Sequence, residues 1–303
     1  VTNKKYFVFF KGAYHGTFDT LLTLKKDLKT NIAKASIPGI TQSILNESFL
    51  FEYGSEEAIS FIQENKEKIA AVLVEPVQSR NPSFQPKSFL QKLRNVTLEN
   101  EIALIFDEVI TGFRIQMGGC QEYFNIEADI VTYGKVIGGG LPIGIVAGKS
   151  KYLDALDGGA WQYGDDSIPQ IKSTFVAGTF CHHPLAMAAS LKTLEILNLS
   201  NGELLQELNN TTTAFCERMN AFFLQNGLKL SLVHFGSLFR FITPGTYKEL
   251  YSQLLLNGVY IWEGRNCFFS IAHNNEVIAL LEEKIVLSCK QLIGNGIIKI
   301  NNL

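Results

Sequence analysis

The sequence lacks the features of a disulfide-stabilised, metal-binding or membrane-spanning chain. Its five cysteines are an odd number and no two of them have Cys-x-x-Cys spacing, which argues against a disulfide framework or a zinc site. Its longest apolar runs have the length of short strands, so we expect no membrane-spanning helix. We therefore expect no metal site, and a reducing cytoplasm as the compartment.

An excess of charge of one sign is also missing. The 27 Lys and Arg residues nearly balance the 29 Asp and Glu residues, and no basic block is present. Neither nucleic acid nor an anionic membrane is therefore expected as a partner. The 303 residues, 46% hydrophobic and 18% charged, suffice for one large domain and a smaller one. The N-terminal stretch VTNKKYFVFF has neither an initiator Met nor a signal-peptide pattern, so we expect a chain cut from a larger protein.

Strands and helices alternate in the first part of the chain. The apolar patterns predict strands at 6–10, 71–74, 103–106, 130–133 and 143–147, and helices at 55–69 and 86–100. Helices between strands indicate an α/β fold with a mixed, mostly parallel sheet that is covered on both faces.

A second set of elements follows. Helices are predicted at 185–197, 203–225, 247–256 and 275–292, and strands at 229–234, 238–242, 259–262 and 267–271. The strands that follow the long helix indicate a separate small α/β domain. We therefore predict a large domain at 1–200 and a small C-terminal domain at 201–303.

Ionisable residues follow three of the predicted strands, namely Glu75, Asp107 and Lys135. The carboxyl ends of parallel strands open onto the ligand crevice of an α/β sheet. A salt bridge between Asp107 and Lys135 would satisfy both charges, and a lysine that only extends from its strand into water would need no further explanation. Pyridoxal phosphate offers another interpretation, because it requires a lysine to hold its aldehyde and a carboxylate to keep its ring nitrogen protonated.

Five motifs carry a resemblance to a known family. The segments KGAYHG, LVEPV, FDEVITGFR, TYGKVIGGGLPIG and AGTF resemble, in this order, the class III aminotransferases of pyridoxal phosphate fold type I, the aspartate aminotransferase-like fold. Within that family the chain is most similar to the glutamate-1-semialdehyde aminomutase branch. The resemblance implies a homodimer, a large cofactor-binding domain and a small C-terminal α/β domain, with the N-terminal part of the large domain missing.

The resemblance also implies roles for single residues around the cofactor. Lys135 corresponds to the lysine that forms the Schiff base with pyridoxal 5'-phosphate, and Asp107 to the partner of the pyridinium nitrogen. Val109 is expected to pack on one face of the ring. Tyr14 is expected to stack on the other face, with His15 beside it.

Two further positions correspond to family residues. Glu75 is expected near the ring hydroxyl or the substrate entrance, and Thr179 matches a threonine that reaches the phosphate across the dimer interface. In the family a Gly- and Ser/Thr-rich phosphate-binding turn lies upstream of the YHG strand. No such turn precedes Tyr6, so we expect half of the phosphate-binding site to be absent from this sequence.

Other segments resemble a subgroup of the family. GTFCHHPLAMAA, the stretch at 161–172 and VYIWEGRNCFFSIAH are similar to aminotransferase domains of polyketide and nonribosomal peptide assembly lines, which implies an acyl carrier protein as partner. Arg265 is predicted to bind the α-carboxylate of an amino-acid donor, with Glu263 holding it when no carboxylate is bound. A salt bridge on a surface hairpin is the alternative.

The expected activity is transamination from an amino-acid donor, glutamate or glutamine, to the carbonyl of a keto or acyl substrate. Lys135 would move the proton as general acid and base. Three alternatives stay open: glutamate-1-semialdehyde 2,1-aminomutase, a decarboxylase or racemase of the same fold, and a cofactor-free scaffold domain.

Overall fold

The computed structural model describes residues 1–22, 25–27, 29–35 and 37–298. The chain divides into two compact units. The first comprises Val1–Gln78 and Gln85–Leu199, and the second comprises Ser79–Phe84 and the chain from Ser200 onward. The predicted domains 1–200 and 201–303 stay a prediction, because compactness alone does not establish a domain.

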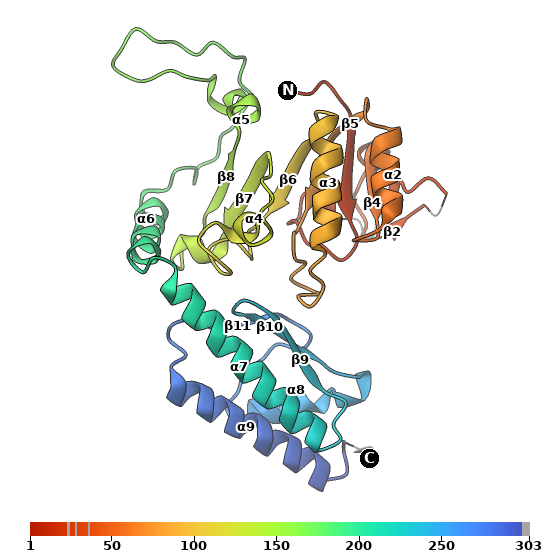
Figure 1. Cartoon of the computed structure of the whole chain (residues 1–303), viewed down its shortest axis with the longest axis vertical. Helices are drawn as coiled ribbons and strands as arrows, with labels where there is room; N and C mark the ends of the chain where they lie inside the picture. Colours follow the sequence, from red (N-terminus) through yellow and green to blue (C-terminus); the bar gives the residue numbers. More distant parts are fainter. Residues whose placement is uncertain (23–24, 28, 36, 299–303) are drawn as a thin grey trace. The chain divides into compact units, whose positions relative to one another are not determined.

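A six-stranded sheet in the order β4-β1-β5-β6-β7-β8 is the centre of the first unit (Figure 1). Its strands are β1 (Tyr6–Phe10), β4 (Ser48–Phe51), β5 (Ile69–Val74), β6 (Ala103–Asp107), β7 (Ile130–Gly134) and β8 (Gly144–Gly148). All neighbours pair in parallel except β7 and β8, which are antiparallel. The predicted mixed, mostly parallel sheet is therefore confirmed. The apolar run of β5 is almost entirely buried, as expected for a strand covered on both faces.

Helices and a hairpin surround this sheet. They are η1 (Asp19–Leu21), β2 (Lys25–Lys26), β3 (Ala33–Lys34), α1 (Gln42–Leu45), α2 (Glu56–Glu64), α3 (Lys87–Glu99), α4 (Gly119–Phe124), η2 (Lys135–Gly138), α5 (Ser150–Asp157) and α6 (Pro184–Leu199). Helices α2 and α3 pack against each other on one face of the sheet (Figure 1). The spacing of Phe89 and Leu93 on α3 places both side chains in the core.

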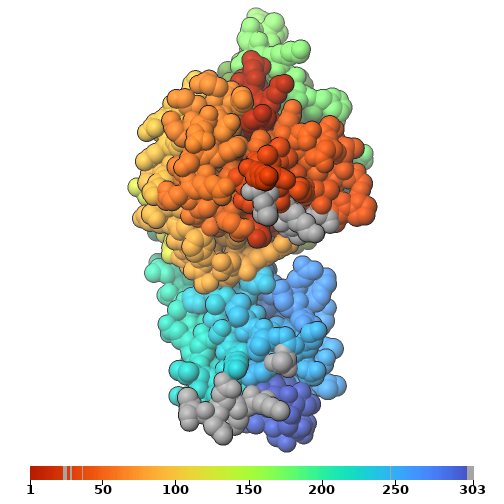
Figure 2. Space-filling view, turned by 90° about the vertical axis from the view of Figure 1, so that its right-hand side faces the viewer, coloured from red at the N-terminus to blue at the C-terminus, as the bar shows by residue number. Residues whose placement is uncertain are grey.

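The two edges of the sheet differ. All four residues of β4 are buried, because α2 and the β2–β3 hairpin lie beside this edge. Figure 2 shows this side of the first unit as a continuous surface of N-terminal side chains, coloured red to orange. At the other edge β8 is largely exposed, and Val146 keeps 53% of its surface accessible. An open strand edge offers unpaired backbone groups to a partner.

The second unit is built around a three-stranded antiparallel sheet in the order β11-β10-β9. Its elements are α7 (Glu203–Gln225), β9 (Ser231–Phe235), β10 (Leu238–Ile242), η3 (Gly245–Tyr247), α8 (Glu249–Leu256), β11 (Cys267–Phe268) and α9 (Asn275–Gly294). The rings of Phe215, Phe239 and Phe269 pack together in its core, with centroids 4.9–5.4 Å apart. None of the helices that the structure describes has both the length and the apolar character needed to cross a membrane.

The predicted strand at 259–262 is wrong. Its Val-Tyr-Ile-Trp sequence has the residue types of a strand, but no described strand pairs with it. Tyr260 and Trp262 are exposed, and the chain enters a turn at Glu263. β-propensity describes how a side chain fits a pleated and half-buried surface, so without a pairing partner it does not produce a strand.

A buried ion-pair network holds the end of the sheet where β7 begins. Asp129 Oδ2 accepts hydrogen bonds from Arg94 Nη1 and from the backbone N–H of Leu104, both at 2.9 Å. Its Oδ1 accepts from Lys149 Nζ at 2.9 Å. Burial acts to raise the pKa of Asp129, but these hydrogen bonds outweigh it and hold the pKa below the ordinary value for aspartate.

We expect Asp129→Asn to lower the free energy of unfolding by about 3 kcal/mol at neutral pH, because Arg94 loses its buried counterion. A carboxylate whose pKa is depressed in the folded state stabilises the fold above its unfolded pKa of about 3.9, and this contribution disappears as the pH falls through the folded pKa. Urea unfolding at about pH 7 and about pH 3 measures this difference. An equal loss of stability at both pH values would contradict the assignment.

Candidate active site

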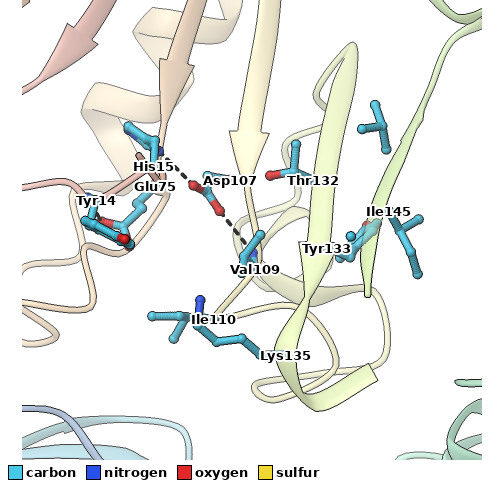
Figure 3. Close-up of a pocket in the computed structure, with 13 residues that line it drawn as sticks. Tyr14, His15, Glu75, Asp107, Val109, Ile110, Thr132, Tyr133, Lys135 and Ile145 are labelled. Carbon is cyan, nitrogen blue, oxygen red and sulfur yellow. Dashed lines mark hydrogen bonds and ion pairs between the residues drawn. The ribbon is translucent and has the colours of Figure 1, made fainter. Parts of the chain in front are cut away.

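A cavity of about 440 Å³ opens at the edge of the sheet where the parallel strands β1, β5, β6 and β7 end (Figure 3). This is the size of a small-molecule site. Six of the residues predicted for the site line it, namely Tyr14, His15, Glu75, Asp107, Val109 and Lys135. They come from four separate segments, which the parallel topology brings to one edge.

Asp107 is the last residue of β6, and its side chain is 10% exposed. Its Oδ1 accepts a hydrogen bond from the backbone N–H of Val109 at 3.1 Å, and its Oδ2 lies 2.7 Å from His15 Nδ1 (Figure 3). In the part of the chain that the structure describes, Asp107 forms its ion-pair contact with His15, not with Lys135. The salt bridge weighed as an alternative is therefore absent from the structure.

His15 leaves one polar atom without a hydrogen-bond partner. Its side chain is 4% exposed, and no described residue bonds its Nε2. Buried polar atoms are seldom unsatisfied, and those that are often mark functional sites. The short contact of Nδ1 with the Asp107 carboxylate fits an N–H donor at that nitrogen. His15 thus holds the Asp107 carboxylate from the side opposite to the Val109 backbone.

Lys135 follows β7 directly and begins the short helix η2. Its backbone lies in the left-handed region with φ of 50°, a conformation that non-glycine residues adopt mainly where the surrounding fold requires it. Although the residue is exposed as a whole, it lines the cavity, and partial loss of hydration lowers the pKa of its amine. Asp107 and Glu75 act in the opposite direction, but burial dominates.

The turn after Lys135 is held by helix α6. At Gly139 a Cβ atom would lie 2.8 Å from Thr193 Oγ1 on α6, so the helix approaches the glycine backbone closely. Gly139 also has a φ of 58°, which a side chain would strain. Gly139 therefore allows the close packing of α6 against this turn.

Glu75 and Tyr14 complete the opposite wall of the cavity. Glu75 follows β5, is 4% exposed, and accepts a hydrogen bond from the backbone N–H of Tyr14 at 3.2 Å. This bond fixes the loop after β1. Tyr14 keeps 46% of its surface accessible and lines the cavity, so a planar ligand can lie against its ring.

Three predicted residues do not line this cavity. Thr179 lies in an exposed turn of the first unit, where the N–H of Cys181 donates to the carbonyl of Gly178. Arg265 and Glu263 belong to the second unit.

Arg265 contacts an aromatic ring within the second unit. Its guanidinium carbon lies 4.6 Å from the centre of the Trp262 ring, and no ion pair joins it to Glu263 among the described residues. The nearby Arg240 donates to the carbonyl of Gly264 at 2.8 Å and so braces the same turn.

Several lining residues were not predicted. Ile110 follows Val109, Thr132 and Tyr133 precede the lysine, and Ile145 and Val146 come from β8. The sequence Gly-Leu-Pro-Ile-Gly, which leads into β8, is typical of a turn. Such a turn reverses the chain, so that β8 pairs antiparallel with β7, the strand before Lys135. Thr132 is the register partner of Asp107 on β6, and Tyr133 pairs with Ile145 on β8, so their places at the cavity follow from the strand pairing.

Comparison with known proteins places the chain in a family. Its sequence matches the family described as "Aminotransferase class-III" over residues 1–267. Glutamate-1-semialdehyde 2,1-aminomutase of Hyperthermus butylicus is 33% identical over 96% of this chain and 70% of its own length. The aminomutase of Methanosphaera stadtmanae is 34% identical over 91% of this chain and 66% of its own length.

Solved structures have the same fold. A structure titled "Transaminase with PLP bound" has a TM-score of 0.85 at 24% identity and covers 97% of this chain and 69% of that chain. A glutamate-1-semialdehyde aminomutase from Pseudomonas aeruginosa in complex with PMP has a TM-score of 0.76 at 18% identity, over 96% and 67%. The chain belongs to the class III aminotransferases, a family of pyridoxal-phosphate-dependent enzymes. The predicted family and fold class are confirmed.

We expect the Lys135 amine to lose its proton at a lower pH than an ordinary lysine, because burial in the cavity disfavours its charged form. Pulse labelling of the protein with an amine-specific acylating reagent between about pH 7 and 11, followed by peptide mass spectrometry, gives the labelling midpoint. The labelling midpoint of Lys135 should lie below the usual lysine pKa near 10.4. A midpoint at or above that range would show that Asp107 and Glu75 dominate.

Proposed function

We propose that this cavity binds pyridoxal 5'-phosphate and that the protein is a glutamate-1-semialdehyde 2,1-aminomutase, which moves the amino group of its substrate from carbon 2 to carbon 1. The main support for this chemistry is that Lys135 and Asp107 line the same cavity, at the ends of two adjacent strands. The choice of reaction is supported by the relatives of that name, which are 33% and 34% identical to this chain.

The lining residues suit the ring and the aldehyde of the cofactor. Lys135 offers an amine of lowered pKa, and Asp107 offers a carboxylate held from two sides. Tyr14 and Val109 offer an aromatic and an apolar surface. The described lining contains no arginine for the phosphate. The residues present therefore account for the reactive part of the cofactor, and the phosphate requires further groups.

When bound, pyridoxal phosphate supplies an aldehyde that captures amines and a cationic ring that accepts electrons. Asp107 holds a proton on the ring nitrogen, and His15 keeps the carboxylate in position for it. Lys135 Nζ would take the proton from the amine-bearing carbon of the substrate and would later deliver a proton to the carbon that receives the amine. Glu75 fixes the Tyr14 loop beside the ring.

A homodimer in the cytoplasm is part of the proposal. Helix α6 exposes the apolar side chains Leu185, Met187 and Leu191, and the edge strand β8 is open. Apolar helix surface of this kind is normally covered. In such a dimer the exposed Thr179 would reach the phosphate bound to the other protomer.

Intermolecular transamination is the second candidate function. The Arg265 guanidinium lies over the Trp262 ring, and no described carboxylate forms an ion pair with it. This arrangement leaves it available to the carboxylate of a glutamate or glutamine donor, with Glu263 as its resting partner. The relatives and structures above lend no support to an assembly-line domain or to a carrier protein as partner.

A substrate test separates the two candidates, and Lys135→Ala tests the cofactor site. Protein with added pyridoxal phosphate should show a visible absorption band, and borohydride should attach the cofactor to Lys135. With 4-amino-5-oxopentanoate alone, an aminomutase forms 5-amino-4-oxopentanoate without any added donor. Lys135→Ala should lose the covalent attachment and all turnover while staying folded. A colourless wild-type protein would favour the cofactor-free scaffold.

Asp107→Asn should keep the shape of the site but lose the charge that holds the ring proton. We expect turnover to fall by about 100-fold or more, on the order of 3 kcal/mol of barrier, with cofactor still bound. Steady-state rates at saturating cofactor measure this effect, and the absorbance band controls for cofactor content. Full activity of the Asn variant would remove Asp107 from the mechanism.

A further inference from the structure

Glu108 is a buried carboxylate that the proposed chemistry does not use. It follows Asp107 and is 1% exposed. Its Oε2 accepts hydrogen bonds from the backbone N–H of Cys120 at 2.6 Å and from Thr111 Oγ1 at 3.1 Å. Its Oε1 accepts from the N–H of Gln121 at 3.2 Å. Burial raises the pKa of Glu108, and these hydrogen bonds act against that rise.

These bonds close the loop formed by residues 109–120 at its base. The loop leaves the sheet at Glu108 and returns at the start of α4, where Cys120 and Gln121 bind the carboxylate. The carbonyl of Glu108 also accepts from the N–H of Gly112 at 2.9 Å. Val109, which the Asp107 side chain holds, is therefore fixed at both ends of its segment.

The same loop lies against the strand that carries the lysine. The rings of Phe113 and Tyr133 are 5.2 Å apart, and a Cβ atom at Gly112 would lie 2.6 Å from Tyr133 Cδ1. The N–H of Glu108 donates to the carbonyl of Thr132 at 2.9 Å. Tyr133 precedes Lys135 by two residues, so the loop contacts the exits of both β6 and β7.

We propose that Glu108 is a positioning residue, whose carboxylate closes the 109–120 loop and so keeps Asp107, Val109 and Lys135 in their mutual arrangement around the cavity. This inference rests on the proposed function, in which the arrangement serves to bind the cofactor. Successive side chains of an extended segment point to opposite sides, so Asp107 points toward the cavity and Glu108 into the loop. The two carboxylates therefore bind different groups.

Gly119 provides an independent way to disturb this contact. Its φ is 63°, and a Cβ atom there would overlap Glu108 Oε2. Gly119→Ala therefore displaces the carboxylate without removing it. Glu108→Gln removes its charge and places an amide N–H against a backbone donor. Asp129→Asn is the matched control, because Asp129 is a comparably buried carboxylate at the opposite end of β7.

Two measurements on the whole protein test the proposal. Amide hydrogen exchange without cofactor reports on the 109–120 loop, and titration with pyridoxal phosphate, followed by the visible band, reports on the site and on the pH midpoint of that band. We expect Glu108→Gln and Gly119→Ala each to speed exchange in the loop and to weaken cofactor binding about tenfold or more, with a shifted pH midpoint. Asp129→Asn lowers the stability of the whole fold, but it should leave exchange in the 109–120 loop under native conditions, cofactor affinity and the pH midpoint unchanged.

The outcomes separate the possible failures. Faster loop exchange with unchanged cofactor affinity and pH midpoint would make Glu108 purely structural and overturn the proposal. An equal effect of Asp129→Asn would overturn it as well. If Glu108→Gln does not fold, Gly119→Ala carries the test. A wild-type protein that never binds the cofactor would refute the proposed function, whereas unchanged loop exchange in Gly119→Ala would refute the role of Glu108 in closing the loop.

Discussion

Parallel pairing of β5, β6 and β7 is the constraint on which the site depends. Glu75 and Asp107 each follow the last pair between β5 and β6, and Asp107 itself pairs with Thr132 on β7. Lys135 comes three residues after Thr132, just beyond the end of β7. A register slip of one residue would reverse the faces of a strand and exchange Asp107 for Glu108 at the cavity. The chemistry of the site is therefore specified by backbone hydrogen bonds that lie well away from it.

Each ionisable group at this edge is satisfied in a different way. Asp107 is held by a histidine and a backbone N–H, Glu75 binds the backbone of the Tyr14 loop, and Lys135 stays partly dehydrated. Two carboxylates thus face one amine whose pKa is lowered. A cationic ring placed between them gains attraction from both carboxylates, while the neutral form of Lys135 avoids repulsion. The charge arrangement of the cavity suits a cationic ligand.

Much of the sheet and the core of the site follow from local sequence. Apolar runs followed by an ionisable residue predicted that Glu75, Asp107 and Lys135 lie where buried strands end. The contact between His15 and Asp107 joins residues 92 positions apart and needs the three-dimensional fold. The strand predicted at 259–262 is the reverse case. Its residues have a high strand preference, but no described strand pairs with them. The roles proposed for Thr179 and Arg265 stay predictions, because neither residue lines the cavity.

The same residues serve both candidate reactions, so the class of chemistry and its specificity lie in different parts of the chain. Under the proposed function, Lys135 would move a proton and Asp107 would hold one whether the amino group returns to the same molecule or passes to another. What separates an aminomutase from a transaminase is whether the first carbonyl product stays bound until the amine is returned. Retention depends on groups that bind the rest of the substrate, and such groups usually sit on loops. Arg265, which contacts the Trp262 ring in a turn, is the residue proposed for such a role, whereas Asp107 ends β6 and Lys135 follows β7 directly. Substitutions in that turn should therefore alter the reaction partner more readily than the reaction chemistry.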